Sequence, residues 1–252
     1  DAIKDIYGDS ITTIYNKSEN TMPAAFESEV KNEFWMGANA NGIVSEHGHK
    51  FVVDWVEGQK TGFFVDQREN RMLVKKYAQG RKVCNMFGYT GGFSIYAMAG
   101  GAVNVDTVDA SKVAIARAAQ NAALNFPDNK THNAIVADAF SYMAKHGSEY
   151  DLVILDPPAF AKHRNSLDNA LKGYKRINQI ALENIETNGI LFTFSCSQAV
   201  SMKDFKKSIF VAAANAKRTI RIIHQLSQPA DHPINIFHPE GDYLKGLVLH
   251  VI

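Results

Sequence analysis

The stretch that decides the fold is KVCNMFGYTGG, residues 82–92. Its first half is mostly apolar, its second half carries glycines at 88, 91 and 92, and a helical pattern begins at Phe93. A buried strand, a glycine turn and a helix N-terminus in this order form a nucleotide-binding crevice. Glycines let the backbone approach a ligand without a Cβ clash. The spacing differs from GxGxxG, which counts against a dinucleotide, and an ordinary glycine-rich turn is the alternative.

Predicted strands alternate with predicted helices from this stretch to the C-terminus. The expected strands are 82–87, 102–108, 134–136, 152–155, 190–194, 219–225 and 246–251. The expected helices are 93–100, 111–124, 139–145, 171–185 and 202–216. Strands joined by helices predict an α/β fold with a mostly parallel, seven-stranded sheet and right-handed crossovers. Ligands bind at the C-terminal ends of the strands in such a sheet.

The first 66 residues have a different pattern and predict a small mixed domain. Short strands are expected at 11–15, 42–45, 51–56 and 62–66, while 24–34 fits either a strand or a helix. A helix at 69–79, with Gly80 as its C-cap, is expected to follow. The boundary is therefore predicted between residues 66 and 67.

Composition is that of an ordinary globular protein, with 46% hydrophobic and 21% charged residues. No apolar run approaches the roughly 20 residues that span a bilayer, and no signal peptide is visible. The two cysteines give neither a disulfide framework nor zinc spacing, which favours a reducing cytoplasm. The chain begins with Asp1 rather than Met, so a native N-terminus upstream is left open.

The net charge of +1 is unevenly distributed. Residues 1–75 carry −4 and the remainder carries +5, so an anionic partner would favour the second part. Basic residues gather after the predicted strand ends and would suit phosphate contacts, although each cluster alone fits a solvated face. These residues are Lys162, His163, Arg164, Lys172, Lys175, Arg176, Lys203, Lys206, Lys207, Lys217, Arg218 and Arg221.

Two carboxylates follow the second and third strands of this sheet. Asp109 lies 21 residues beyond Gly88, a spacing that suits binding of ribose hydroxyls. A solvated carboxylate or a cap of the helix that begins near Ser111 is the alternative, and Asp106 is a rival for the ribose. Asp138 fits either a contact with an adenine amine or an N-cap of the next helix.

The segment DPPAF, residues 156–160, follows the fourth strand. A carboxylate, two prolines that fix the backbone and an aromatic ring predict a rigid platform for a flat base. A helix cap with a turn is the structural alternative. Cys196 follows the fifth strand between two serines, which makes it a candidate nucleophile, although a lone cysteine is more often an inert small hydrophobe. Cys84 lies inside the first strand and is expected in the core.

Several segments together resemble a known family. They are GHKFVVDWVEGQKTGFFVDQRENR, NMFGYTGGF, VDTVDAS, LDPPAFAK, GYKRIN, LFTFSCS and ADHPINIFHPEGDYLKG. The combination resembles the class I S-adenosylmethionine-dependent methyltransferases of the bacterial type I subfamily, which act on cytosine carbon 5 in large-subunit (23S) rRNA. The resemblance implies a Rossmann-like methyltransferase domain at 67–252 behind a small α+β, RNA-contacting domain at 1–66. Many members also carry an N-terminal PUA domain, which is absent from these residues.

The resemblance also implies roles for individual residues. Cofactor-binding roles fall on Arg68, Phe87, Gly88, Tyr89, Thr90, Gly91, Gly92, Asp109, Ser111, Asp138, Ala139 and Asp156. Catalytic roles fall on Cys196 and Asp156, and substrate-binding roles on Pro157, Pro158, Phe160, Lys162 and Lys175. The implied cofactor is S-adenosylmethionine, with S-adenosylhomocysteine as product, and the implied partner is rRNA of the large ribosomal subunit. No metal and no membrane are implied, and a homodimer is left open.

The implied chemistry explains these residue types. Carbon 5 of cytosine is a poor nucleophile, and a thiolate adding to carbon 6 makes an enamine that can attack a sulfonium methyl. Asp156, protonated or sharing a proton with ring nitrogen 3, would offset charge that develops on the ring. The target must be unpaired or flipped out. The alternatives are a methyltransferase acting on a guanine or an adenine amine, which needs no thiol, and a non-catalytic RNA-binding protein.

Overall fold

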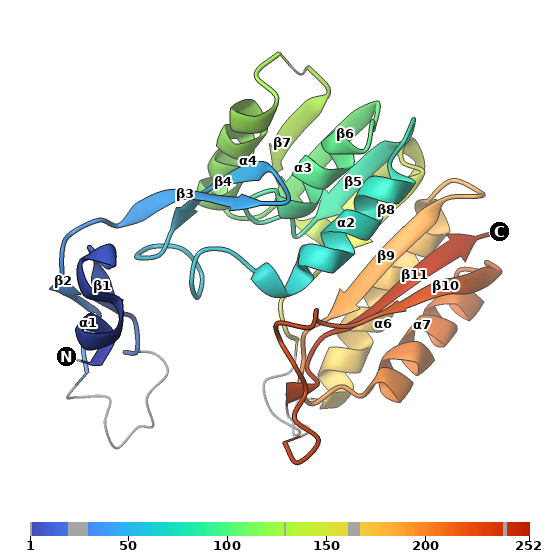
Figure 1. The fold of residues 1–252 in the computed structure, drawn as a ribbon. Helices are drawn as coiled ribbons and strands as arrows, with labels where there is room; N and C mark the ends of the chain where they lie inside the picture. Colours follow the sequence, from blue (N-terminus) through green and yellow to red (C-terminus); the bar gives the residue numbers. More distant parts are fainter. Residues whose placement is uncertain (1, 20–29, 129, 161–166, 239–240) are drawn as a thin grey trace. The chain divides into compact units, whose positions relative to one another are not determined.

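The computed structural model describes residues 2–19, 30–128, 130–160, 167–238 and 241–252. The chain divides into two compact units, Asp1–Phe64 and Val65–Ile252. This division falls two residues before the boundary that the sequence suggested. Figure 1 traces both units in sequence colours.

The first unit combines short helices with two small antiparallel sheets of two strands each (Figure 1). Its elements are α1 (Ala2–Tyr7), η1 (Gly8–Ser10), β1 (Ile14–Asn16), β2 (Glu33–Met36), β3 (Asn41–Glu46) and β4 (His49–Asp54). Strand β1 pairs with β2, and β3 pairs with β4. Of the ambiguous segment 24–34, residues 24–29 lie outside the described residues, and β2 begins at Glu33.

The predicted strand at 62–66 is wrong, because the chain turns there and then forms the short 3₁₀ helix η3 (Val65–Gln67). Gly62 has a φ of +86° and its N–H donates to the Gln59 carbonyl at 2.8 Å. A Cβ on Gly62 would lie 2.5 Å from the Asp54 carbonyl oxygen, so this turn requires glycine. A tight turn against β4 leaves no extended backbone for a further strand.

The second unit contains a seven-stranded sheet in the order β10-β11-β9-β8-β5-β6-β7 (Figure 1). Its strands are β5 (Lys82–Met86), β6 (Asn104–Asp109), β7 (His132–Val136), β8 (Leu152–Leu155), β9 (Ile190–Ser195), β10 (Ile220–Leu226) and β11 (Lys245–Val251). Only β11 runs against its neighbours β9 and β10 among these strands. The prediction of a mostly parallel, Rossmann-like sheet is confirmed.

Helices connect the strands and pack on both sides of the sheet. They are α2 (Arg68–Tyr77), α3 (Gly92–Ala99), α4 (Lys112–Asn125), α5 (Ala139–His146), η4 (Gly147–Glu149), α6 (Leu167–Asn184) and α7 (Met202–Asn215). Helix α2 ends on Ala78 as its C-cap, so the prediction of Gly80 in that role is wrong. Gly80 instead takes a φ of +72° in the turn that leads to β5. None of the described helices is both long and apolar enough to cross a bilayer.

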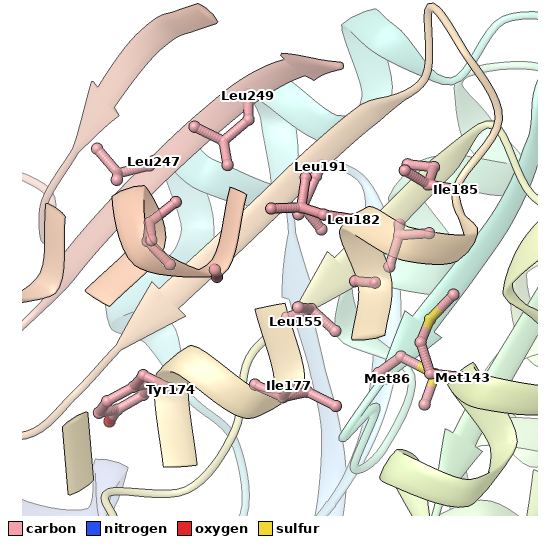
Figure 2. Close-up of a cluster of buried hydrophobic side chains, with 14 of the residues drawn as sticks. Met86, Met143, Leu155, Tyr174, Ile177, Leu182, Ile185, Leu191, Leu247 and Leu249 are labelled. Carbon is pink, nitrogen blue, oxygen red and sulfur yellow. The ribbon is translucent and has the colours of Figure 1, made fainter. Parts of the chain in front are cut away.

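The core on the α5–α6–α7 side fixes the position of the central strands. Met86 and Leu155, from β5 and β8, are fully buried against side chains of α5 and α6 (Figure 2). Cys84 lies fully buried in the same cluster, with its Sγ 3.1 Å from the Met86 Sδ. Its expected place in the core is therefore observed.

The order in which strands are added to the sheet reverses between β5 and β8. The chain passes from β5 outward to β6 and β7, and then crosses to β8 and outward to β9. Connections leave the C-terminal ends of β5 and β8 in opposite directions, which opens the space where ligands bind in parallel α/β sheets. Residues 87–92 and 156–160 begin at these two strand ends.

We expect Gly88→Ala to destabilise the fold by about 1–3 kcal/mol through overpacking. An added Cβ would lie 2.5 Å from the Thr107 Cγ2 atom. Thr107 cannot rotate away cheaply, because it is fully buried and its Oγ1 is hydrogen-bonded to Ser94 (2.6 Å) and His132 (2.8 Å). Thermal melting in the absence of ligand measures the effect.

Gly92→Ala is the matched control for this prediction. Its added Cβ would lie 3.4 Å from the Arg71 side chain, an ordinary van der Waals contact, and alanine favours the first turn of α3. This variant should melt at or above the wild-type temperature. Equal melting temperatures for Gly88→Ala and wild type would contradict the packing argument.

Candidate active site

The turn after β5 is held in an uncommon backbone conformation. Phe87 and Tyr89 have φ values of 57° and 47°, in the left-handed region that non-glycine residues seldom adopt. The Gly88 N–H donates to the Val108 carbonyl at 3.0 Å, which ties the turn to β6. Gly91, with a φ of 82°, is the N-cap of α3 and offers no side chain to its first N–H groups. These donors suit an anionic ligand group at the helix N-terminus.

Asp109 ends β6 beside this turn. Its Oδ2 accepts a hydrogen bond from the Tyr89 N–H at 3.0 Å, and its Oδ1 accepts one from the Ser111 N–H at 2.9 Å. Each carboxylate oxygen has a further lone pair, so the half-buried group can still accept from the hydroxyls of a ligand. Ser111 itself caps α4 by accepting from the Ala114 N–H at 3.2 Å.

Asp106, the rival candidate, serves the fold instead. It is buried and accepts hydrogen bonds from the Asn133 side chain at 2.7 Å and from the hydroxyls of Tyr142 and Tyr150. These donors satisfy the carboxylate inside the protein. Of the two carboxylates of β6, Asp109 is therefore the one that contacts the glycine turn.

Asp138 is the N-cap of α5, one of its two predicted roles. Its Oδ1 accepts from the Ser141 N–H at 2.9 Å and from the Ser141 Oγ at 2.8 Å. These two hydrogen bonds hold the pKa of Asp138 below its usual value. The carboxylate is solvent-exposed, and the next residue, Ala139, is buried. An adenine contact through Asp138 remains a proposal.

Asp156 follows β8 and has the most distinctive electrostatic setting of the predicted residues. Desolvation, followed by the negative charge of Asp66, raises its pKa to about 7. A hydrogen bond from the Gln67 Nε2 to Oδ2, at 3.2 Å, and the charge of Arg71 act in the opposite direction. A carboxyl group poised near neutrality can donate or accept a proton at physiological pH.

Asp66 and Gln67 both act on Asp156, and the sequence patterns assigned a role to neither of them. The Asp66 Oδ2 accepts a hydrogen bond from the Tyr243 hydroxyl at 2.7 Å, while Oδ1 is buried without a hydrogen-bond partner among the described residues. Gln67 is oriented toward Asp156 by the Asn70 side chain, which donates to Oε1 at 2.7 Å. The signal in the sequence is the motif DQR, residues 66–68, in which the resemblance implied a role for the arginine alone.

Arg68 contacts neither the glycine turn nor Asp156 in the described contacts, and it pairs with Asp231 instead. Its Nη1 lies 2.8 Å from the Oδ2 of Asp231, in the segment between β10 and β11. Its Nε also lies 3.3 Å from the neighbouring Glu69 carboxylate. Both pairs are exposed, so they contribute little to stability. Nothing in these contacts joins Arg68 to the glycine turn, and its cofactor role remains a proposal.

The rest of the DPPAF segment presents an apolar surface that packs on α6 through Phe160. Phe160 packs on the buried Tyr174 ring, with centroids 4.8 Å apart. Pro157 is buried, whereas Pro158 is exposed and Phe160 is half-buried. Lys175, in α6, is also half-buried, and Lys162, His163 and Arg164 lie outside the described residues.

Cys196 lies directly after β9, next to the end of β8. Its thiol is half-buried, and Sγ lies 3.9 Å from the Pro157 carbonyl oxygen. Cys84 is different, because complete burial raises the pKa of its thiol well above the usual value. A desolvated thiol is a poor source of thiolate, so Cys196 is the better candidate nucleophile of the two.

Comparison with known proteins identifies the family of this fold and site. Residues 28–244 match the sequence profile of the S-adenosylmethionine-dependent methyltransferases. The chain belongs to this family. Its cofactor is therefore S-adenosylmethionine, and the glycine turn with the adjacent Asp109 fits the amino-acid and ribose parts of that molecule.

Curated relatives carry a more particular name, Ribosomal RNA large subunit methyltransferase I. The protein from Shewanella frigidimarina is 42% identical over 212 residues, and the protein from Aeromonas salmonicida is 44% identical over 210 residues. The matches cover 83% and 82% of this chain and 53% of each relative. The chain thus spans about half the length of these relatives.

A solved structure agrees with the fold. The crystal structure of SMU.776, a protein assigned to the methyltransferases, contains S-adenosylhomocysteine. It matches the present structure with a TM-score of 0.77 at 28% identity, covering 87% of this chain and 58% of that one.

The raised pKa of Asp156 predicts a specific dependence of stability on pH. The unfolded pKa is about 4 and the folded pKa is about 7, so the folded protein binds more protons in this interval. Stability must then fall as the pH rises through it. Asp156→Asn cannot ionise, so its stability relative to wild type should increase by at least about 1 kcal/mol between pH 5 and pH 8.

Denaturant unfolding of both proteins at pH 5 and pH 8 gives the four free energies of unfolding from which this change is calculated. Other titrating groups act in both proteins and cancel. The same wild-type-to-variant difference at pH 5 and pH 8 would show that Asp156 ionises as an ordinary aspartate.

Proposed function

We propose that this protein transfers the methyl group of S-adenosylmethionine to carbon 5 of a cytosine in large-subunit rRNA, through a covalent adduct with Cys196. The observation that carries the proposal is a half-buried thiol 3.9 Å from Pro157, the residue after a carboxyl group with a pKa of about 7. The names of the relatives support an rRNA substrate. Such a substrate would place the enzyme in the cytoplasm.

The cofactor would lie across the C-terminal ends of β5, β6 and β7. The N–H groups of the turn at 87–92 would bind its carboxylate, and Asp109 would accept from the ribose hydroxyls. Asp138 is exposed at the N-terminus of α5, where its second carboxylate oxygen could accept from the adenine amine. The sulfonium centre of the bound cofactor supplies an electrophilic methyl group.

The target base would lie between the ends of β8 and β9. The Cys196 thiolate adds to carbon 6, forming a carbon–sulfur bond and moving an electron pair toward carbon 5. Asp156, protonated near neutrality, donates a hydrogen bond to ring nitrogen 3 and offsets the charge that develops there. After methyl transfer, a base takes the carbon 5 proton; the electron pair of that carbon–hydrogen bond re-forms the ring double bond, and the carbon–sulfur bond breaks to release the thiolate.

RNA binding would rest on the positive charge of the second part of the chain. Residues 76–252 carry a net charge of +5, and Lys175 is partly accessible on α6. Pro158 and Phe160 offer an apolar ledge at the site, and Phe160 is supported from one side by Tyr174. An aromatic surface of this kind stacks on a base that has been taken out of a helix.

Cys196→Ala should reduce methyl transfer at least about a thousandfold, because removal of a nucleophile abolishes the covalent route. The assay uses methyl-labelled S-adenosylmethionine and large-subunit RNA from cells that lack the gene. Cofactor binding should be retained. Cys84→Ala is the matched control and should stay active if it folds, since that thiol is buried in the core.

A Cys196→Ala variant with near wild-type activity would contradict the cytosine-5 mechanism. Methylation of an exocyclic amine of guanine or adenine would then be the better account. Failure of the wild type to bind S-adenosylmethionine would instead favour a non-catalytic RNA-binding role.

Asp109→Ala should weaken S-adenosylmethionine binding at least roughly tenfold. The reason is the loss of charge-assisted hydrogen bonds worth about 1.5–3 kcal/mol. Isothermal calorimetry on the folded variant measures the affinity. Asp128→Ala removes an exposed carboxylate beyond the C-terminus of α4 and should bind normally. Unchanged affinity in Asp109→Ala would remove this residue from the cofactor site.

A further inference from the structure

Lys245 is a buried lysine beside the candidate nucleophile. It begins β11, lies opposite Ser195 in the antiparallel register with β9, and exposes only 3% of its surface. Lysine is seldom buried this completely, because taking an ammonium group out of water is costly. A position of this kind calls for a compensating interaction or a function.

The Lys245 ammonium group is held by a backbone carbonyl. Its Nζ donates to the Ser197 carbonyl oxygen at 2.7 Å, and it forms no ion pair with a carboxylate among the described residues. Burial lowers its pKa, while the negative charges of Asp242 and of an ionised Cys196 favour its charged form. Because the residue that accepts this hydrogen bond, Ser197, directly follows Cys196, the Lys245 ammonium group is held in the surroundings of the thiol.

Ser197 is fixed on three sides, and it is the residue directly after Cys196. Besides the bond from Lys245, its Oγ is 3.0 Å from the Tyr174 hydroxyl. Its N–H donates to the Ser195 Oγ at 3.4 Å, so both serines that flank the cysteine are bound and fully buried. Cys196 alone of the three is half-buried. Hydrogen bonds thus anchor the buried residues on either side of one partly accessible thiol.

We propose that Lys245 is a positioning residue that anchors the Cys196 segment through the Ser197 carbonyl and stabilises the Cys196 thiolate with its buried positive charge. The inference deepens the proposed function and rests on the role of Cys196 as nucleophile. A positive charge near a thiol, in a poorly solvated place, increases the fraction of thiolate at neutral pH.

The other titratable groups that face this thiol do not supply the same charge. Tyr174, from α6, and Tyr243, from the segment before β11, have pKa values raised mainly by burial, so both hydroxyls stay neutral. Asp242 is negative and acts on Lys245 in the opposite sense to burial. Of the groups named here, Lys245 is the one that can place a positive charge beside the Cys196 thiolate.

The test is the pH dependence of Cys196 alkylation by iodoacetamide, followed by mass spectrometry of the peptide that contains Cys196. Lys245→Gln removes the charge but keeps a hydrogen-bond donor, whereas Lys245→Arg keeps the charge. The alkylation midpoint should rise by about one pH unit in Lys245→Gln and stay near the wild-type value in Lys245→Arg. A purely structural role for the lysine would leave the midpoint unchanged in Lys245→Gln.

Cys84 provides an internal control for folding in the same samples. It is fully buried, so its peptide should remain unmodified in any variant that keeps the native fold. A wild-type midpoint for Lys245→Gln, with Cys84 protected, overturns the proposal. Failure of the proposed function has a separate signature, since Cys196→Ala would then still methylate RNA whatever the alkylation midpoints are.

Discussion

The reversal of strand order between the parallel strands β5 and β8 is the constraint on which the site depends. Because β5 continues to one side of the sheet and β8 to the other, their C-terminal ends meet at an open edge. The glycine turn, Asp109 and Asp156 all emerge there, although up to 69 residues of sequence separate them. Hydrogen bonds from Gly88 and Tyr89 to β6 then hold the turn against its neighbour.

Burial gives the residues at this edge their chemical character. Desolvation and a neighbouring carboxylate keep Asp156 partly protonated near neutral pH. Desolvation also makes the ammonium group of Lys245 a stronger electrostatic neighbour than it would be in water. One end of the crevice thus offers rigid N–H donors for a cofactor, and the other offers a proton and an accessible thiol. The proposed transfer of a methyl group to a cytosine ring requires this division of roles.

The sequence was sufficient for features encoded in local patterns. Apolar runs ending in glycine or aspartate marked the strands, and the carboxylates after them proved to lie at the strand ends. The strand predicted at 62–66 failed because a turn against β4 overrode the β-branched and aromatic pattern. Asp66, Tyr243 and Lys245 were missed because their importance comes from contacts with residues far away in the chain, and no spacing rule encodes such contacts.

The central claim is a covalent bond between Cys196 and the target base, and an RNA containing 5-fluorocytosine tests it most directly. Fluorine cannot leave carbon 5 as a proton does, so the adduct should persist after methyl transfer. With S-adenosylmethionine present, wild type and Cys84→Ala should form a protein–RNA adduct stable to denaturing electrophoresis, and Cys196→Ala should form none. An active wild type without an adduct, or an adduct in Cys196→Ala, would contradict the account.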